Sequence, residues 1–184
     1  EKDLGGLQTV FKRYFLSDAA NQAELLPEDK KCAVSRIQQP PLDGSKIALW
    51  LVLQKDPDFR CQDNGMWHDS KGRIIVGDGE PLIGDSHDAT TTHLRRLSER
   101  LENAHSSLLD GCLRTWFMVH DVDRNYWGVV TGRNEEFERR GLTRHTHFIS
   151  STGIGGSPVS KGEIVAFNAV CDTKLKPHQM GFVY

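Results

Sequence analysis

The sequence lacks several patterns that mark common protein classes. Its cysteines are far apart and form no Cys-x-x-Cys pair; they are Cys32, Cys61, Cys112 and Cys171. This spacing argues against a disulfide scaffold or a zinc ribbon and favours a reduced, cytoplasmic protein. No stretch approaches the roughly 18 apolar residues of a membrane helix, and no charged-then-apolar leader opens the chain. We therefore expect a soluble protein without a membrane partner.

An excess of basic charge is also missing. The chain has 23 Lys and Arg against 25 Asp and Glu, a formal net charge of -2. Because each phosphate contact needs a cation and no basic stripe is visible, nucleic acid is not an expected partner. The 184 residues, 38% of them hydrophobic, suit one compact core.

The two ends of the sequence differ from ordinary termini. It begins without Met, and its last five residues, 180–184, are MGFVY, apolar where a free end is usually polar. We therefore expect a piece of a longer protein.

The first half of the chain predicts mainly strands. A strand is expected at 7–15, followed by a short helix between 18 and 31. Apolar runs separated by a Pro-Pro and Asp-Gly loop predict two more strands, at 32–38 and 46–53. Residues 69–72 have the composition of a hairpin tip, which leads into a strand at 73–76.

Two helices are expected in the second half. The first begins at Ser86 or Asp88 and ends near Gly111, with an apolar stripe formed by Leu94, Leu97, Leu101, Ala104 and Leu108. The second covers about 125–140 and ends at Gly141, although Gly128 and Gly132 weaken it. Its shared side consists of Trp127, Val130, Asn134 and Phe137.

Three further strands complete the pattern, at 112–120, 144–151 and 163–171, the last two joined by a glycine turn. In the first of these, one side carries Arg114, Trp116, Met118 and His120. The order of elements predicts an α+β fold with a mixed sheet and two helices packed on one face. We expect the other face to pack against a neighbour in the same chain or in another copy.

The stretch RHTHFISSTGIGG, residues 144–156, allows three interpretations. His145 and His147 share a side of a strand, but no third ligand stands at a diagnostic spacing, so no metal is predicted. A phosphate loop would need a helix after the glycines, and none is expected there. As a pocket rim, the stretch offers Arg144 for a carboxylate and small donors such as Thr152, with Gly153 allowing close approach. An ordinary half-exposed strand explains the composition equally well.

Several motifs together resemble a known superfamily. They are Ser106-Ser107-Leu108, the strand LRTWFM at 113–118, the acidic turn 121–123, the helix that ends in Phe137, and the strand pair 144–151 and 163–171. This arrangement resembles the Rid (YjgF) superfamily over about residues 45–172. The stretches RYFLSD at 13–18, RTW at 114–116 and THFISSTGI at 146–154 look more like a double-length branch that shares its layout with the chorismatases.

The resemblance implies a chorismate-mutase-like fold assembled as a homotrimer or pseudo-trimer, with this chain as the first half. It divides the chain into an N-terminal extension (1–45), a Rid-like domain (46–172) and the start of a connection to a missing half (173–184). Family members hydrolyse imines and enamines without a cofactor, in a pocket between subunits. An RNA-cleaving activity attached to some members is not expected here, because the charges are balanced.

The resemblance also implies roles for single residues. The family's carboxylate-binding arginine falls on His145, with the only nearby arginine at Arg144; neighbours on a strand face opposite sides. Asn168 stands where the family has a glutamate and would orient water, and the typical Ser-Gly-Gln is absent, with Leu53-Gln54-Lys55 nearby. The predicted catalytic residues are Asn168 and His145, and the predicted substrate-binding residues are Arg144, Arg114, His147, Thr152 and Gly153.

The expected ligand is a small carboxylate-bearing metabolite. Two alternatives to imine hydrolysis stay open. One is a chorismatase-like hydrolase whose general acid comes from the missing half, because no carboxylic acid stands on the predicted pocket strands. The other is a noncatalytic half that completes a pseudo-trimer.

Overall fold

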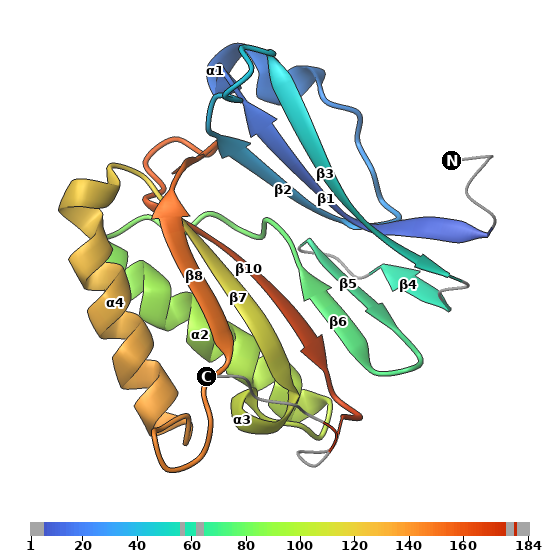
Figure 1. The fold of residues 1–184 in the computed structure, drawn as a ribbon, viewed down its shortest axis with the longest axis vertical. Helices are drawn as coiled ribbons and strands as arrows, with labels where there is room; N and C mark the ends of the chain where they lie inside the picture. The colour runs from blue at the N-terminus through green and yellow to red at the C-terminus, as the bar shows by residue number, and fades with distance from the viewer. Residues whose placement is uncertain (1–5, 56–57, 62–64, 176–178, 180–184) are drawn as a thin grey trace.

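The computed structural model describes residues 6–55, 58–61, 65–175 and 179, and its strands form two sheets (Figure 1). The smaller sheet has the order β3-β1-β2-β9 and consists of β1 (Leu7–Leu16), β2 (Ala33–Gln38), β3 (Ile47–Lys55) and β9 (Ser157–Pro158). The larger has the order β4-β5-β6-β10-β7-β8 and consists of β4 (Phe59–Cys61), β5 (Met66–Asp69), β6 (Arg73–Val76), β7 (Cys112–Val119), β8 (Ser150–Gly155) and β10 (Val165–Asp172).

Two long helices, α2 (Ser86–Asn103) and α4 (Val122–Arg139), cover one face of the larger sheet (Figure 1). The predicted start of the first helix is confirmed, with Asp85 as its cap; Oδ1 of Asp85 accepts from the backbone N–H of Asp88 at 2.9 Å. The core between helices and sheet contains the predicted stripe residues Leu94, Leu97, Leu101 and Leu108. The α+β class with two helices on one face is therefore confirmed.

The first helix ends earlier than predicted. Asn103 is its last residue, His105 has a positive φ of 57°, and a separate short helix, α3 (Leu108–Gly111), follows. Ser107 caps α3 by accepting from the backbone N–H of Asp110. A local cap within the apolar stripe thus divides the predicted helix in two, and Ala104 is exposed.

The buried side of α4 also differs from the prediction. Trp127 is 75% exposed, and the buried residues of this helix are Val129, Gly132, Glu136 and Phe137. A Cβ on Gly128 would lie 2.9 Å from the backbone nitrogen of His87, and one on Gly132 would lie 2.9 Å from the carbonyl oxygen of the same residue. The glycines therefore let α4 approach α2 closely, a packing role that helix propensity does not reveal.

The face of the larger sheet that points away from α2 and α4, called the second face below, packs against the smaller sheet. Apolar clusters join the sheets; one contains Phe11, Trp67 and Ile75, and another contains Ile37, Met118 and Ala166. The predicted packing of this face on a neighbour is thus confirmed, within the same chain. The expected boundary at residue 45 falls between β2 and β3, which belong to one sheet.

Residues 18–31 form less helix than expected. Only α1 (Ala19–Gln22) and the 3-10 turn Ala23–Leu25 are helical. Leu26 is extended, with ψ at 141°, because the residue before a proline, here Pro27, avoids the helical region. Among the described residues, no helix is long and apolar enough to cross a lipid bilayer.

The predicted strand at 144–151 is wrong over most of its length. The chain between α4 and Ser150 forms turns and an irregular segment. Oγ1 of Thr146 donates to the carbonyl of Gly141 at 2.6 Å, and the backbone N–H of Thr146 donates to the carbonyl of Thr143 at 3.1 Å. These local bonds compete with strand pairing, as Ser and Thr side chains often do in turns.

The predicted glycine turn is a strand instead. Gly153 and Gly155 lie in β8, which pairs in parallel with β7. A Cβ on Gly153 would lie 2.7 Å from Cε2 of Tyr126, so the glycine makes room for an aromatic ring of α4. Close packing, and not a reversal of the chain, accounts for these glycines.

Candidate functional site

The candidate site lies where β7 and β8 meet on the second face. Their parallel register places Arg114 opposite Ser150 and Trp116 opposite Thr152. Nη1 of Arg114 donates to Oγ of Ser150 at 2.9 Å, and Nη2 donates to Oγ1 of Thr152 at 3.1 Å. The same guanidinium lies 4.7 Å from the ring centre of Trp116. Hydroxyls on the neighbouring strand and an aromatic ring thus fix the planar fork of Arg114.

A second guanidinium reaches this region from the smaller sheet. Arg13 of β1 is 3% exposed, and its Nη2 donates to Oδ1 of Asn168 on β10 at 2.8 Å. Three aromatic rings surround it; the distances from its Cζ to the ring centres are 5.3 Å for Phe11, 5.0 Å for Trp50 and 4.9 Å for Trp116. We call Arg13, Trp50, Arg114, Trp116, Ser150 and Thr152 the arginine patch.

The two cations of the patch are close enough to affect each other. Burial lowers the pKa of Arg13 to about 10, Asp78 counteracts this, and the charge of Arg114 lowers it further. Arg13 is therefore still cationic at neutral pH. In the described part of the chain, the arginines in ion pairs are Arg36, Arg73, Arg95, Arg139 and Arg140, which leaves both patch arginines without a carboxylate partner. A buried cation without a counter-charge is costly, so the patch favours an anion.

Of the predicted residues, Arg114, Thr152 and Asn168 are brought together. Asn168 is 1% exposed, its Oδ1 accepts from Arg13, and its Nδ2 donates to the carbonyl of Phe167 at 2.9 Å. The side-chain amide of Asn168 is therefore a buried acceptor that fixes the position of the Arg13 guanidinium.

The remaining predicted residues lie elsewhere. Arg144 and His145 are exposed in the turn before β8, where Nε of Arg144 donates to Nε2 of His145 at 3.1 Å. The alternation of facing sides that was expected for this pair does not apply, because neither residue is in a strand. His147 is buried just ahead of β8, and Gly153 lies against Tyr126 of α4.

Arg13 and Trp50 were missed as site residues. Both lie in strands that the sequence predicts, but their contact with β7 and β10 depends on packing between the sheets. The available signal is the alternation of β1, in which Phe11, Arg13 and Phe15 share one side, so that a cation stands between two aromatic residues on an otherwise apolar face.

One group of potential metal ligands is present among the described residues: Asp85, His87 and Asp88 at the start of α2. Asp85 already caps the helix, and Nε2 of His87 is 2.9 Å from Oε2 of Glu135. The hydrogen bonds to Glu135 and Asp88 raise the pKa of His87. Helix capping and a surface ion pair account for this group, and the expectation of no metal stays a prediction.

Comparison with known proteins gives matches at the level of structure. No protein-family model and no curated protein matches the sequence. A chorismatase structure matches with a TM-score of 0.62 and 13% identity, over 95% of this chain and 49% of the chorismatase chain. A YjgF/YER057c/UK114 family member from Mycobacterium tuberculosis matches with a TM-score of 0.46 and 20% identity, over 58% of this chain and 83% of that one. The structure of E. coli TdcF with bound serine matches with a TM-score of 0.47 and 12% identity, over 57% of this chain and 84% of that one.

The chorismatase match covers nearly the whole chain, so it includes both sheets and both long helices. The predicted Rid-like fold, in the layout shared with the chorismatases, is therefore confirmed. The chain spans about half the length of that chorismatase. At this identity the similarity concerns the fold, and function has to be argued from the site.

Proposed function

We propose that the chain binds a small carboxylate-bearing metabolite at the arginine patch and hydrolyses imine or enamine intermediates there. The observation that supports this most is the juxtaposition of Arg13 and Arg114 without a carboxylate partner in the described part of the chain. A ligand carboxylate would complete this charge pattern, because a guanidinium–carboxylate bond, in which both partners are charged, is stronger than the bonds that Arg114 makes to two neutral hydroxyls.

Arg114 is the proposed anchor. Its side chain is half-buried and its fork is already oriented, so little conformational entropy is lost when an anion binds. Ser150 and Thr152 can donate their hydroxyl protons to the bound carboxylate. The rings of Trp50 and Trp116, 5.8 Å apart, would form an apolar wall for the rest of the metabolite.

The choice of reaction follows from the side chains present on the second face. None of the residues that β7, β8 and β10 place on the second face in this region is an acid; they are Arg114, Trp116, Met118, Ser150, Thr152, Ile154, Ala166 and Asn168. An imine carbon is electrophilic enough to react with a water that is held beside it, so anchoring and orientation supply most of what the reaction needs. An enol ether requires a general acid and would need one from another segment.

A noncatalytic role is the second candidate. It is favoured by the engagement of Asn168 with Arg13, since a buried amide with partners on both of its polar atoms is poorly placed to orient water. In this case the patch binds its ligand and a partner half performs the chemistry. The homotrimer or pseudo-trimer and the cytoplasmic location are part of the same proposal.

An ammonia-release assay separates the two candidates. Imines are generated in solution by an amino-acid oxidase from several amino acids, and their hydrolysis is followed with and without the chain. We expect acceleration by the wild type, a loss of at least about tenfold in Arg114→Ala, and no change in Arg144→Ala or in the exposed control Arg124→Ala. Wild-type protein that does not accelerate hydrolysis rules out the catalytic proposal, and calorimetric titration with pyruvate then tests binding alone.

A further inference from the structure

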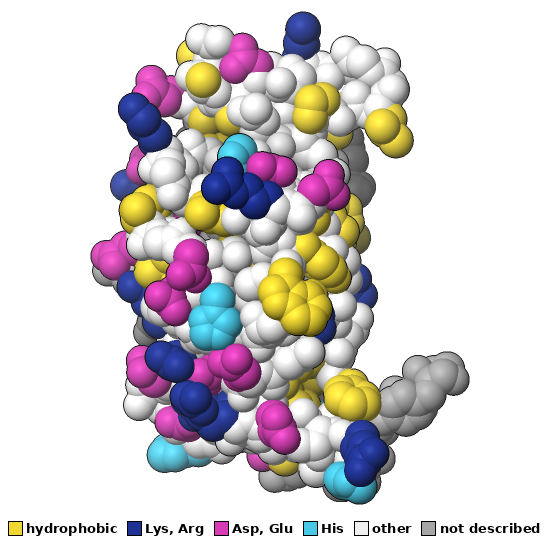
Figure 2. Space-filling model, turned by 90° about the vertical axis from the view of Figure 1, so that its left-hand side faces the viewer, with side chains coloured by type: hydrophobic (Ala, Val, Ile, Leu, Met, Phe, Trp, Pro, Cys, Tyr) yellow, Lys and Arg dark blue, Asp and Glu magenta, His cyan; other side chains and the backbone are white. Residues whose placement is uncertain are grey.

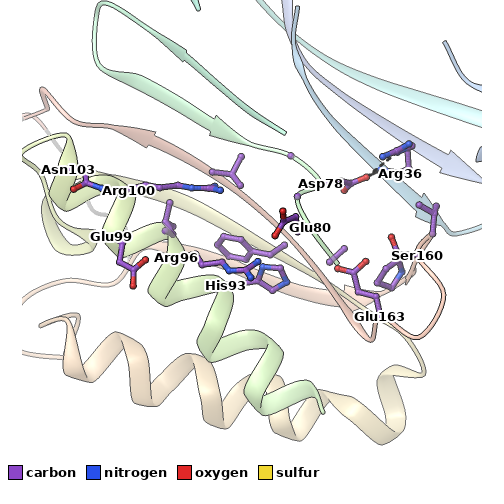
Figure 3. Close-up of a pocket in the computed structure, with 18 residues that line it drawn as sticks. Arg36, Asp78, Glu80, His93, Arg96, Glu99, Arg100, Asn103, Ser160 and Glu163 are labelled. Carbon is purple, nitrogen blue, oxygen red and sulfur yellow. Dashed lines mark hydrogen bonds and ion pairs between the residues drawn. The ribbon is translucent and has the colours of Figure 1, made fainter. Parts of the chain in front are cut away.

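A cavity of about 340 Å³ lies apart from the arginine patch, between α2, the loop after β6 and the loop before β10 (Figure 3). Its charged lining comes from opposite walls: His93, Arg96, Glu99 and Arg100 from α2, and Arg36, Asp78, Glu80 and Glu163 from β2 and the two loops. None of the patch residues lines it. The volume is at the lower end of the range for ligand pockets, about 300 to 1,000 Å³, and suits a molecule of amino-acid size.

The α2 wall carries two arginines, Arg96 and Arg100, against one glutamate, Glu99, so its net charge is positive. Arg96 and Arg100 are one turn apart, and neither is among the described arginines that form ion pairs. Burial, together with the charge of Arg96, lowers the pKa of Arg100. His93 adds no charge at neutral pH, because burial lowers its pKa to about 4. Its Nε2 therefore donates to the carbonyl of Val165 at 3.1 Å, and its ring stacks on Phe167.

The opposite wall is acidic. Oδ2 of Asp78 accepts from the backbone N–H of Arg36 at 2.7 Å and lies 3.4 Å from Nε of the same residue, while Oδ1 is buried without a hydrogen-bond partner. Burial raises the pKa of Glu163 to about 7, and the nearby charge of Asp78 contributes to the rise. Figure 3 shows Glu163 beside Ser160, and Glu80 on the same loop as Asp78, extending into the cavity.

The two walls carry opposite charges that do not pair with each other. The ion pairs of the described residues include one from this cavity, Arg36 with Asp78, which lies within the acidic side. Arginine and glutamate side chains are long enough to meet across a narrow gap, so walls that remain apart leave room for a charged ligand. From this arrangement we propose that the cavity binds a small zwitterion, with its carboxylate at Arg96 and Arg100 and its ammonium group at Asp78 and Glu163.

Each end of the cavity suits one group of such a ligand. Two adjacent guanidiniums favour a carboxylate, which can accept from both. An ammonium group placed between Asp78 and Glu163 relieves the repulsion of the two carboxylates and provides a donor for the buried Oδ1 of Asp78. Because the ammonium group favours the ionised form of Glu163, binding should release a proton near neutral pH and tighten between pH 6 and pH 8.

Calorimetric titration with charge-matched probes tests the proposal. The probes are the L-amino acids, and each one that binds is compared with its deaminated acid and its decarboxylated amine. We expect at least one amino acid to bind. In the Arg114→Gln variant, whose arginine patch no longer takes up a carboxylate, each analogue should bind at least about tenfold more weakly than its amino acid because it lacks one charged group. Binding of the deaminated acid to Arg114→Gln with the affinity of the amino acid, or no binding by any amino acid, would overturn the proposal.

Variants locate the binding. Arg100→Gln and Arg96→Gln should each weaken affinity at least about tenfold. Glu163→Gln should weaken it and reduce its dependence on pH above pH 7, while Asp78, whose pKa is raised to about 6 by burial, still titrates. Arg124→Gln on the exposed side of α4 is the control and should bind normally, whereas Arg114→Gln removes only the binding of a carboxylate at the arginine patch and should leave the cavity occupied. A loss in Arg114→Gln with normal binding in Arg100→Gln would place the ligand in the patch and contradict the proposed cavity. Circular dichroism establishes that each variant is folded.

Discussion

Nη2 of Arg13 donates a hydrogen bond of 2.8 Å to Oδ1 of Asn168, across 155 positions of sequence. This bond joins β1 of the smaller sheet to β10 of the larger one. It holds a guanidinium inside an aromatic cage next to Arg114, so the stability of the chain and the charge of the candidate site depend on the same contact.

Removing the acceptor should therefore cost more than an average polar substitution. Asn168→Ala leaves the buried guanidinium without its side-chain acceptor, and we expect the free energy of unfolding to fall by about 2 to 3 kcal/mol. Urea denaturation measures the loss, with Arg124→Ala as an exposed control that should change stability by less than about 0.5 kcal/mol. An effect of Asn168→Ala as small as that of the control would mean that the bond contributes nothing.

Gly128 of α4 gives a test of helix packing against helix propensity. Propensity alone predicts that Gly128→Ala stabilises the helix by about 1 kcal/mol. The contact with the backbone of His87 predicts the opposite, because the added Cβ would lie 2.9 Å from its nitrogen and the helices would have to separate. Thermal unfolding should show a lower Tm for Gly128→Ala and an unchanged or slightly higher Tm for Asn134→Ala, which is exposed on the same helix. A rise in Tm for both variants would contradict the packing.

Glu163 makes stability depend on pH. Its carboxyl has an ordinary pKa of 4.5 and a pKa of about 7 in the folded chain. A raised pKa means that the neutral form is favoured by folding, so the contribution to stability is complete below about pH 4.5 and is lost as pH rises through 7. Glu163→Gln removes this loss. The free energy of unfolding of Glu163→Gln, measured by urea denaturation relative to the wild type, should therefore rise between pH 5 and pH 8. The exposed control Glu138→Gln should show no such trend.

The elements with a strong local pattern could be predicted from the sequence. The stripe of Leu94, Leu97 and Leu101 identifies α2, and the alternation around Arg114 and Trp116 identifies β7 and the mixed character of its second face. Figure 2 shows acidic and basic side chains interspersed on the face it presents, in line with the balanced composition. In α2 and β7 most of the residues that the periodicity marks as apolar are buried, so the sequence alone identifies both elements.

The failed predictions have two physical causes, local side-chain hydrogen bonds and long-range packing. The segment from Thr143 to Ile149 contains strand-forming residues, but a hydroxyl bond from Thr146 to the backbone holds a turn. Gly153 resembles a turn residue until the ring of Tyr126 is known to lie against it. The same holds for Arg13, since its place beside Arg114 depends on packing between two sheets. Long-range contacts decided the cases of Gly153 and Arg13, and a single sequence does not display them.

A crystal structure of the chain with a bound 2-oxo acid, such as pyruvate, would show whether the arginine patch binds the ligand carboxylate. We expect the carboxylate to lie within about 3 Å of the guanidinium nitrogens of Arg114, next to the hydroxyls of Ser150 and Thr152. A carboxylate bound instead at the exposed pair Arg144 and His145, or an arginine patch that stays empty at saturating pyruvate, would contradict it.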